Sequence, residues 1–273
     1  MIGQEALLQF IQKQVDTETF PRFSIIVGKK GSGRRTLVHK IFTTFGGVFT
    51  DIGTSIADIR QMISEAYRLN GVNSVYLIAD ADEMSLQAQN ALLKVAEEPP
   101  NNAYIIMTVE DEQNVLSTIA SRGNVYMMEN YTKDEIRQYT KNNYNVDSDS
   151  LNIICQYCET IGEIKTLMEY DPNKFNEFIL LVVDKVSKVS LANALKIADK
   201  LSLKDEADKY SLKIFYTAFL AICGQRMTED RKYLEWCLIT TNALRKLYTI
   251  RGINKQMLFD NWLFDIREWD DGC

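Results

Sequence analysis

The sequence predicts an α/β domain built on a parallel sheet, followed by a part made only of helices. Short apolar runs alternate with amphipathic helical patterns up to about residue 128, and this alternation is typical of a doubly wound parallel sheet. A glycine-rich turn follows the first apolar run and leads into a helical pattern. After residue 128 only helical patterns continue, so the sheet is expected to end there.

Four apolar runs are predicted as strands. They span residues 23–27, 75–78, 103–109 and 125–128. A helical pattern follows the first run from Thr36 onward, and two further helices begin at capping residues, Ser55 and Ser85. The Pro99-Pro100 pair ends the helix that begins at Ser85, because proline cannot continue the helical hydrogen-bond ladder.

The helical part is predicted to contain two domains. It begins with a capping box from Thr132 to Glu135, and Pro172 is a candidate hinge. We expect an α/β domain over residues 1–129, a small helical domain over 130–171 and a helical C-terminal domain over 172–273. The apolar stripes of the last domain are typical of a helical core and also of an oligomer contact. We favour the oligomer contact. The stripes are formed by Phe175, Phe178, Ile179, Val182, Val183, Val186 and Val189, and by Tyr210, Ile214, Phe215 and Phe219.

Charge and composition argue against a stand-alone nucleic-acid-binding module. The formal net charge is -6 and the sequence pI is about 5.1, whereas such modules are basic. The one basic patch, Lys29, Lys30, Arg34 and Arg35, is explained equally well by a loop that faces phosphates. We see no signal peptide and no apolar run of about 20 residues, so a cytoplasmic protein without membrane contact is expected.

The cysteines do not predict a metal site. Cys155 and Cys158 form a CxxC motif, but a second pair is missing, and the only histidine, His39, is distant in the sequence. A zinc site usually needs four such ligands. We interpret the two cysteines as reduced thiols on a buried helix face.

The loop at residues 28–36 has the context of a phosphate-binding loop, because it follows a strand and opens a helix. Its candidate nucleotide-binding residues are Gly28, Gly31, Gly33, Arg34, Arg35 and Thr36. Arg34 takes the place of the phosphate-binding lysine, and Arg35 that of the hydroxyl residue that ligates Mg²⁺. A guanidinium repels a cation. The interpretations are a relic loop, which we favour, binding of ATP, ADP or phosphate without hydrolysis, and true hydrolysis.

The second apolar run ends without a complete pair of catalytic acids. An ATPase strand of this kind normally ends in Asp-Glu, where the Asp serves Mg²⁺ and the Glu activates water. Here Ala79 and Asp80 occupy those two positions, which leaves a degenerate motif. Asp80, Asp82 and Glu83 are either a metal cluster or, as we favour, acids that cap the next turn and helix. We predict no metal site.

Two stretches carry a family resemblance. Residues 90–100, NALLKVAEEPP, resemble the NALLKxLEEPP helix of bacterial clamp-loader subunits, which belong to the AAA+ superfamily. Residues 108–122, TVEDEQNVLSTIASR, resemble the family segment that ends in Ser-Arg-Cys, and residues 2–5 and 55–63 agree as well. The resemblance covers residues 1 to about 170. It implies a P-loop, AAA+-like α/β domain with a helical lid and an all-helical collar.

The eroded loop and strand make the delta-prime subunit of DNA polymerase III the best match within that family. The resemblance then implies a non-hydrolysing subunit of the polymerase III holoenzyme, with no intrinsic ATPase and no resident cofactor or zinc. Its partners would be the motor and delta subunits, and through the complex the sliding clamp and primed DNA. The alternative is an active AAA+ motor subunit of a clamp loader or a related DNA-processing machine, which Arg34, Arg35 and Ala79 oppose.

The resemblance also assigns an arginine finger. Arg122 matches the family arginine that reaches into the ATP site of the adjacent subunit, where it stabilises transition-state charge. The alternative is an ordinary surface or structural arginine. Gly123 departs from the family cysteine. Lys165 stands where active members carry a phosphate-sensing arginine, and it keeps the charge but loses the bidentate fork.

Overall fold

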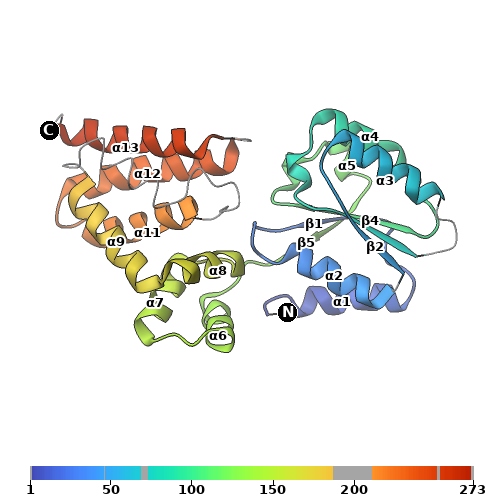
Figure 1. Cartoon of the computed structure of the whole chain (residues 1–273), viewed down its shortest axis with the longest axis horizontal. Coiled ribbons are helices and arrows are strands. Elements are labelled where there is room, and N and C mark those ends of the chain that lie inside the picture. Colours follow the sequence, from blue (N-terminus) through green and yellow to red (C-terminus); the bar gives the residue numbers. More distant parts are fainter. Residues whose placement is uncertain (1, 46, 69–72, 187–210, 251–252, 272–273) are drawn as a thin grey trace. The chain divides into compact units, whose positions relative to one another are not determined.

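The computed structural model describes residues 2–45, 47–68, 73–186, 211–250 and 253–271. The chain forms two compact units, Met1–Glu135 and Ile136–Cys273 (Figure 1). The first is an α/β unit and the second is helical, as the sequence predicts. The further division of the helical part at Pro172 stays a prediction.

A parallel sheet lies at the centre of the first unit. Its described strands run in the order β2-β3-β4-β1-β5, and every neighbouring pair is parallel. The strands are β1 (Phe23–Val27), β2 (Val48–Ile52), β3 (Ser74–Ile78), β4 (Ala103–Val109) and β5 (Asn124–Met127). The sequence patterns predict all of these strands except β2. That strand lies at a sheet edge and is half exposed, so it lacks the apolar run of a central strand.

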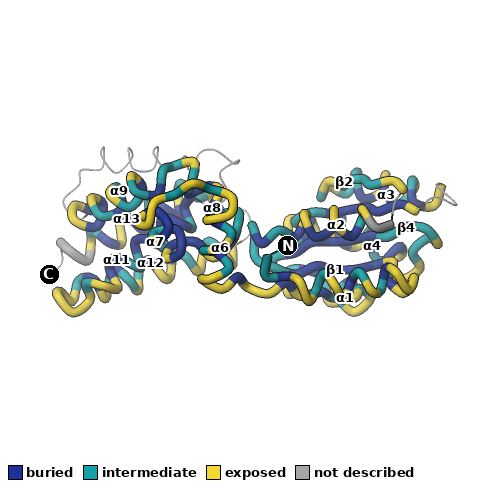
Figure 2. Tube along the Cα trace, turned by 90° about the horizontal axis from the view of Figure 1, so that it is seen from below, coloured by how far each residue is buried: buried dark blue, intermediate teal, exposed yellow. Residues whose placement is uncertain are grey.

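Helices cover both faces of the sheet (Figure 1). They are α1 (Glu5–Asp16), α2 (Arg34–Phe45), α3 (Ile56–Arg68), α4 (Leu86–Glu97) and α5 (Ser117–Ala120), with short 3-10 turns at η1 (Ala81–Glu83) and η2 (Glu112–Asn114). Alternate strand residues face opposite sides. Ile25 of β1 packs in the cluster with α3, α4 and α5, and Ile26 packs with α1 and α2. Figure 2 shows β1 buried along its length.

The predicted helix starts are confirmed by their hydrogen bonds. Ser55 Oγ accepts from Asp58 N at 3.2 Å, and Ser85 Oγ accepts from Ala88 N at 3.2 Å. At the start of α6 (Lys133–Asn143), Glu135 N donates to Thr132 Oγ1 and Thr132 N donates to Glu135 Oε2. These bonds pair backbone N–H groups that the helix itself leaves without partners.

The second unit is built from helices packed around aromatic side chains. Its described helices after α6 are α7 (Ser148–Tyr157), α8 (Ile161–Tyr170), α9 (Pro172–Lys185), α11 (Ser211–Arg226), α12 (Arg231–Thr249) and α13 (Lys255–Asp271). Phe219 of α11 contacts Trp236 of α12 and Trp262 of α13. An ion pair between the buried Glu163 and Lys213 links α8 to α11. None of the described helices is long and apolar enough to cross a membrane.

The apolar stripes of the second unit form its core. In α9 the buried residues include Phe175, Ile179, Val182 and Val183. Val189 and Tyr210 lie outside the described residues. Three side chains of the α11 stripe are at most 1% exposed inside this unit, namely Ile214, Phe215 and Phe219. That the C-terminal helices make an oligomer contact stays a prediction.

The CxxC cysteines are buried free thiols, as predicted. Cys155 lies in α7, and Cys158 follows its last residue as the C-cap. Within the described part of the chain no group of three or more His, Cys, Asp or Glu side chains is arranged to hold a metal ion.

Candidate phosphate loop and arginine finger

The glycine-rich loop joins β1 to α2, and its glycines are required by its shape. Gly31 and Gly33 have φ of 85° and 93°, in the left-handed region that glycine enters without steric cost. At Gly28 a Cβ atom would lie 3.0 Å from both Ser32 Oγ and Met128 Cβ. Tyr131 Oη donates to Ser32 O at 2.7 Å. The segment therefore forms the predicted strand–loop–helix turn.

The first arginine of the loop, Arg34, is tied to the segment that follows β3. Arg34 is only 6% exposed, and its Nη2 lies 2.5 Å from Asp80 Oδ1. Asp80 has a left-handed φ of 49°, and its backbone N donates to Thr108 Oγ1 of β4 at 3.1 Å. Arg34 Nη1 is buried without a hydrogen-bond partner among the described residues. The structure thus joins two residues that the sequence singled out in separate motifs.

The second arginine of the loop, Arg35, points to the sheet edge. Arg35 Nη2 lies 2.9 Å from Asp51 Oδ1 of β2, and both side chains are about half exposed. Thr36, the next residue of α2, is also exposed. That Arg35 stands where an active loop carries the Mg²⁺-ligating hydroxyl stays a prediction.

The acids that follow β3 have partners in their own chain. Asp82 accepts from Glu110 N at 3.2 Å through Oδ2. Glu83 Oε1 lies 3.3 Å from Lys30 Nζ, and Asp80 is held by Arg34. These contacts tie the turn after β3 to the glycine-rich loop and to the end of β4. Ala79 is a partly buried side chain that packs against the core cluster formed with α1 and α2.

Arg122 lies in the short connection between α5 and β5. Its Nε and Nη2 both donate to Glu97 Oε1, at 2.9 and 2.5 Å, and its Nη1 donates to Thr118 O at 2.5 Å. The side chain is 34% exposed and that of Glu97 is 51% exposed. Arg122 therefore lies partly exposed at the surface, with its guanidinium oriented by Glu97 and Thr118.

Two residues that support Arg122 were missed at the sequence level. Glu97 ends α4 and pairs with Arg122. Gln89 is 1% exposed, and its Oε1 accepts from Leu116 N, the N-cap of α5, at 2.8 Å. Both belong to the conspicuous segment around residues 90–100. The signals available in the sequence were a glutamine on the apolar stripe of this helix and two acids, Glu97 and Glu98, before a Pro-Pro pair.

The neighbours of Gly123 explain why a glycine stands at this position. A Cβ atom there would lie 2.9 Å from Ile25 Cδ1 and 3.2 Å from Phe23 Cε1. The side chains of β1 therefore fill the volume that a cysteine at this position would need. The departure at Gly123 leaves the guanidinium of Arg122 in place.

Lys165 is exposed on α8 in the second unit. Its assignment to the phosphate site stays a prediction, as do the roles of the loop residues and of Arg122.

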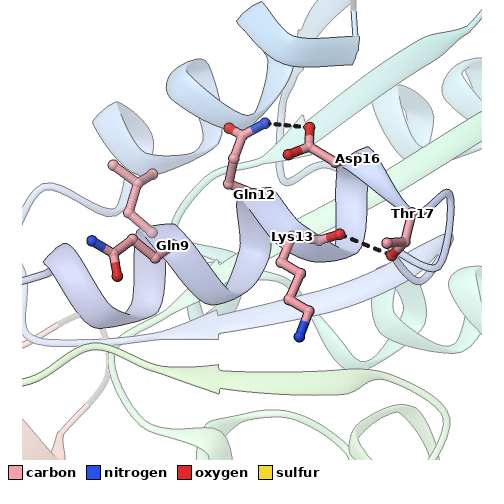
Figure 3. Close-up of a pocket in the computed structure, with 6 residues that line it drawn as sticks. Gln9, Gln12, Lys13, Asp16 and Thr17 are labelled. Carbon is pink, nitrogen blue, oxygen red and sulfur yellow. Dashed lines mark hydrogen bonds between the residues drawn. The ribbon is translucent and has the colours of Figure 1, made fainter.

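A surface hollow lies elsewhere, on the outer side of α1 (Figure 3). Its walls come from one helix and the turn after it, including Gln12, which donates to Asp16, and Thr17, which donates to Lys13 O. None of the predicted site residues lines it. An open hollow on a single helix does not provide converging polar groups, so it suggests no catalytic site.

Comparisons with known proteins agree with the resemblance. Residues 13–132 match the family model described as DNA polymerase III, delta subunit. DNA polymerase III subunit delta' of Haemophilus influenzae is 36% identical over 77 residues, which are 28% of this chain and 23% of that protein. DNA polymerase III subunit gamma of Buchnera aphidicola is 29% identical over 125 residues, 43% of this chain and 34% of that protein. The chain thus aligns with only about a quarter to a third of these relatives' length.

Solved structures share the fold. A DNA polymerase III gamma subunit-related protein of Thermotoga maritima has a TM-score of 0.52 at 19% identity, covering 97% of this chain and 99% of that one. A RuvB variant of Thermotoga maritima has a TM-score of 0.51 at 15% identity, covering 81% and 88%. At such identities the likeness concerns the fold alone, a P-loop α/β domain followed by a helical region. The family match and the curated relatives show that part of this chain is similar to DNA polymerase III subunits delta' and gamma.

Proposed function

We propose that this chain is a delta-prime-type clamp-loader subunit that does not hydrolyse ATP and lends Arg122 to the ATP site of a neighbouring motor subunit. The observation that carries the first half of the proposal is the ion pair between Arg34 and Asp80. It joins the residue in the place of the phosphate-binding lysine to the residue in the place of the catalytic acid.

The pair removes both groups from phosphate chemistry. In a hydrolysing loop the lysine reaches the β- and γ-phosphates, while the acid orients the attacking water. Here the guanidinium of Arg34 neutralises Asp80, and Asp80 occupies Nη2 of Arg34. Arg35 adds a positive charge where Mg²⁺ would bind. Each step of hydrolysis therefore lacks the group that would perform it.

Arg122 supports the second half of the proposal. It is the exposed arginine of the Ser-Arg segment, and it follows directly on a helix that packs against α4. A guanidinium delivered in trans stabilises the charge of the transferring phosphoryl group and increases the rate by orders of magnitude. The proposed partners are the motor and delta subunits. The clamp and primed DNA are reached through the complex.

Binding of a nucleotide or phosphate without turnover is a second candidate for the loop. Arg34 Nη1 is buried and has no partner in the described structure, at the N-terminus of α2, where backbone N–H groups favour an anion. Titration calorimetry with ADP on the wild-type chain and on Arg34→Ala tests it. Heat that is lost in the variant supports binding, and the absence of heat in both chains contradicts it.

The main experiment measures ATP turnover by the cognate motor subunits with clamp and primed DNA. Arg122→Ala is expected to lower kcat by a factor of about 100 or more, while the complex still assembles. Arg60→Ala, which removes an exposed arginine of α3, is the matched control and leaves the rate unchanged. An unchanged rate with Arg122→Ala contradicts the finger. Magnesium-dependent turnover by the chain alone, lost in Arg34→Ala, would instead identify a motor subunit.

A further inference from the structure

We propose that Glu97 is a positioning residue that holds the guanidinium of Arg122 in the orientation required for its action on a neighbouring ATP site. This inference rests on the proposed function of Arg122. It assigns to the end of α4 a role in setting the geometry of an arginine that lies 25 positions later in the chain.

The hydrogen bonds of Arg122 leave two of its N–H donors available for a phosphoryl group. An arginine has five N–H donors in a planar fork. Nε–H and one N–H of Nη2 are given to Glu97, and one N–H of Nη1 is given to Thr118 O. One N–H therefore remains on each terminal nitrogen. Two parallel donors from one guanidinium match two oxygens of a phosphoryl group.

The support beneath Glu97 is rigid. It is the last residue of α4, whose preceding residues Val95 and Ala96 are at most 5% exposed in the core. On the other side, Gln89 of the same helix fixes the backbone at Leu116, where α5 begins. One helix thus holds both the segment that carries Arg122 and the guanidinium itself, which is how functional groups are kept in a productive geometry.

The exposure of the pair indicates that Glu97 orients the side chain of Arg122 without holding it so tightly that its charge becomes unavailable. Arg122 is 34% and Glu97 51% exposed, and exposed pairs of this kind bind weakly. Such a contact restricts the rotamers of a long side chain, but it does not withhold the charge from a polyphosphate. The expected contribution is a factor of about 3 to 5 in kcat, the range that a weak exposed pair allows, with KM for ATP unchanged.

The test compares four variants of the full chain in the assembled complex with cognate motor subunits, clamp and primed DNA. Glu97→Gln is expected to lower kcat about threefold to fivefold without changing KM. Glu98→Gln removes the same charge from the next, exposed residue, and it is expected to match the wild type. Glu97→Asp, which keeps a shorter carboxylate, is expected to recover part of the lost rate. Arg122→Ala gives the reference loss.

A double variant separates positioning from a structural effect. When Arg122 is already alanine, the change Glu97→Gln is expected to leave the residual rate unaltered, because the two residues act as one unit. Additive losses would overturn the inference. It is equally overturned if Glu97→Gln equals Glu98→Gln, or raises the rate, while Arg122→Ala is strongly impaired; the proposed function then stands. If Arg122→Ala has no effect, the proposed function falls and this inference with it.

Discussion

The first unit contains two arginine–carboxylate pairs that look alike in distance and differ in burial. Arg34 and Asp80 lie 2.5 Å apart with side chains 6% and 25% exposed. Arg122 and Glu97 also lie 2.5 Å apart but are 34% and 51% exposed. A buried pair cannot lose one member without leaving a charge in the interior, whereas an exposed pair exchanges freely with water. The charge of Arg34 is therefore held inside its own chain, whereas the charge of Arg122 stays accessible at the surface.

The largest expected effect concerns the buried pair. Asp80→Asn removes the charge but keeps a residue that tolerates the left-handed φ of 49°. It is expected to lower the free energy of unfolding by about 2.5 kcal/mol, less than for fully buried pairs because Asp80 is a quarter exposed. Urea unfolding of the full chain measures it. The control Asp51→Asn, in the exposed pair with Arg35, should cost about 0.5 kcal/mol, and equal losses would remove the distinction between the pairs.

The next effect tests how the finger end is anchored. Gln89→Met keeps the volume of the buried side chain but leaves Leu116 N without its acceptor. An unsatisfied N–H costs about 2 kcal/mol, which the same urea experiment detects. Gln87→Met changes an exposed glutamine of the same helix and is expected to be neutral. A neutral Gln89→Met would show that α5 is held by packing alone.

A third prediction concerns Gly123, beside the finger. Gly123→Cys places Cβ 2.9 Å from Ile25, and this overpacking is expected to cost about 1.5 kcal/mol. In Ile25→Ala plus Gly123→Cys the two losses are expected to be less than additive, because alanine removes both Ile25 atoms, Cδ1 and Cγ1, that lie 2.9 Å from the added Cβ. Thermal unfolding of the four chains measures the coupling. Gly224→Cys, where no atom lies within 4 Å of the added Cβ, serves as the control without a clash. Strict additivity would show that Ile25 does not exclude the cysteine.

The smallest expected effect concerns the exposed pair. Glu97→Gln is expected to change the free energy of unfolding by about 0.5 kcal/mol, and the difference should shrink with added salt because the charges are screened. Urea unfolding at low and high salt checks this. A loss as large as that of Asp80→Asn would show that the two pairs contribute equally to stability. It would contradict the inference that the pair between Arg122 and Glu97 is weak.

Sequence patterns predicted most strands of the first unit but missed one of them. The central strands β1, β3 and β4 were predicted because burial on both faces requires continuous apolar runs. β2 was missed because an edge strand needs no such run, and Thr50 and Asp51 interrupt its pattern. In the helical unit the apolar stripe of α11 was visible, but periodicity does not tell a core face from a contact face. Burial of Phe215 and Phe219 shows that these two side chains belong to the core of this unit.

The sequence by itself determined which chemical groups the chain carries: Arg34 and Arg35 after a glycine-rich turn, Ala79 and Asp80 after the second apolar run, and a Ser-Arg segment at Arg122. These follow from residue identity in a local motif. Only the tertiary structure decided which groups meet, placing Asp80 on Arg34 and Glu97 on Arg122. The partner and burial of a charge depend on which distant segments fold side by side, and that depends on the packing of the whole unit rather than on any local pattern.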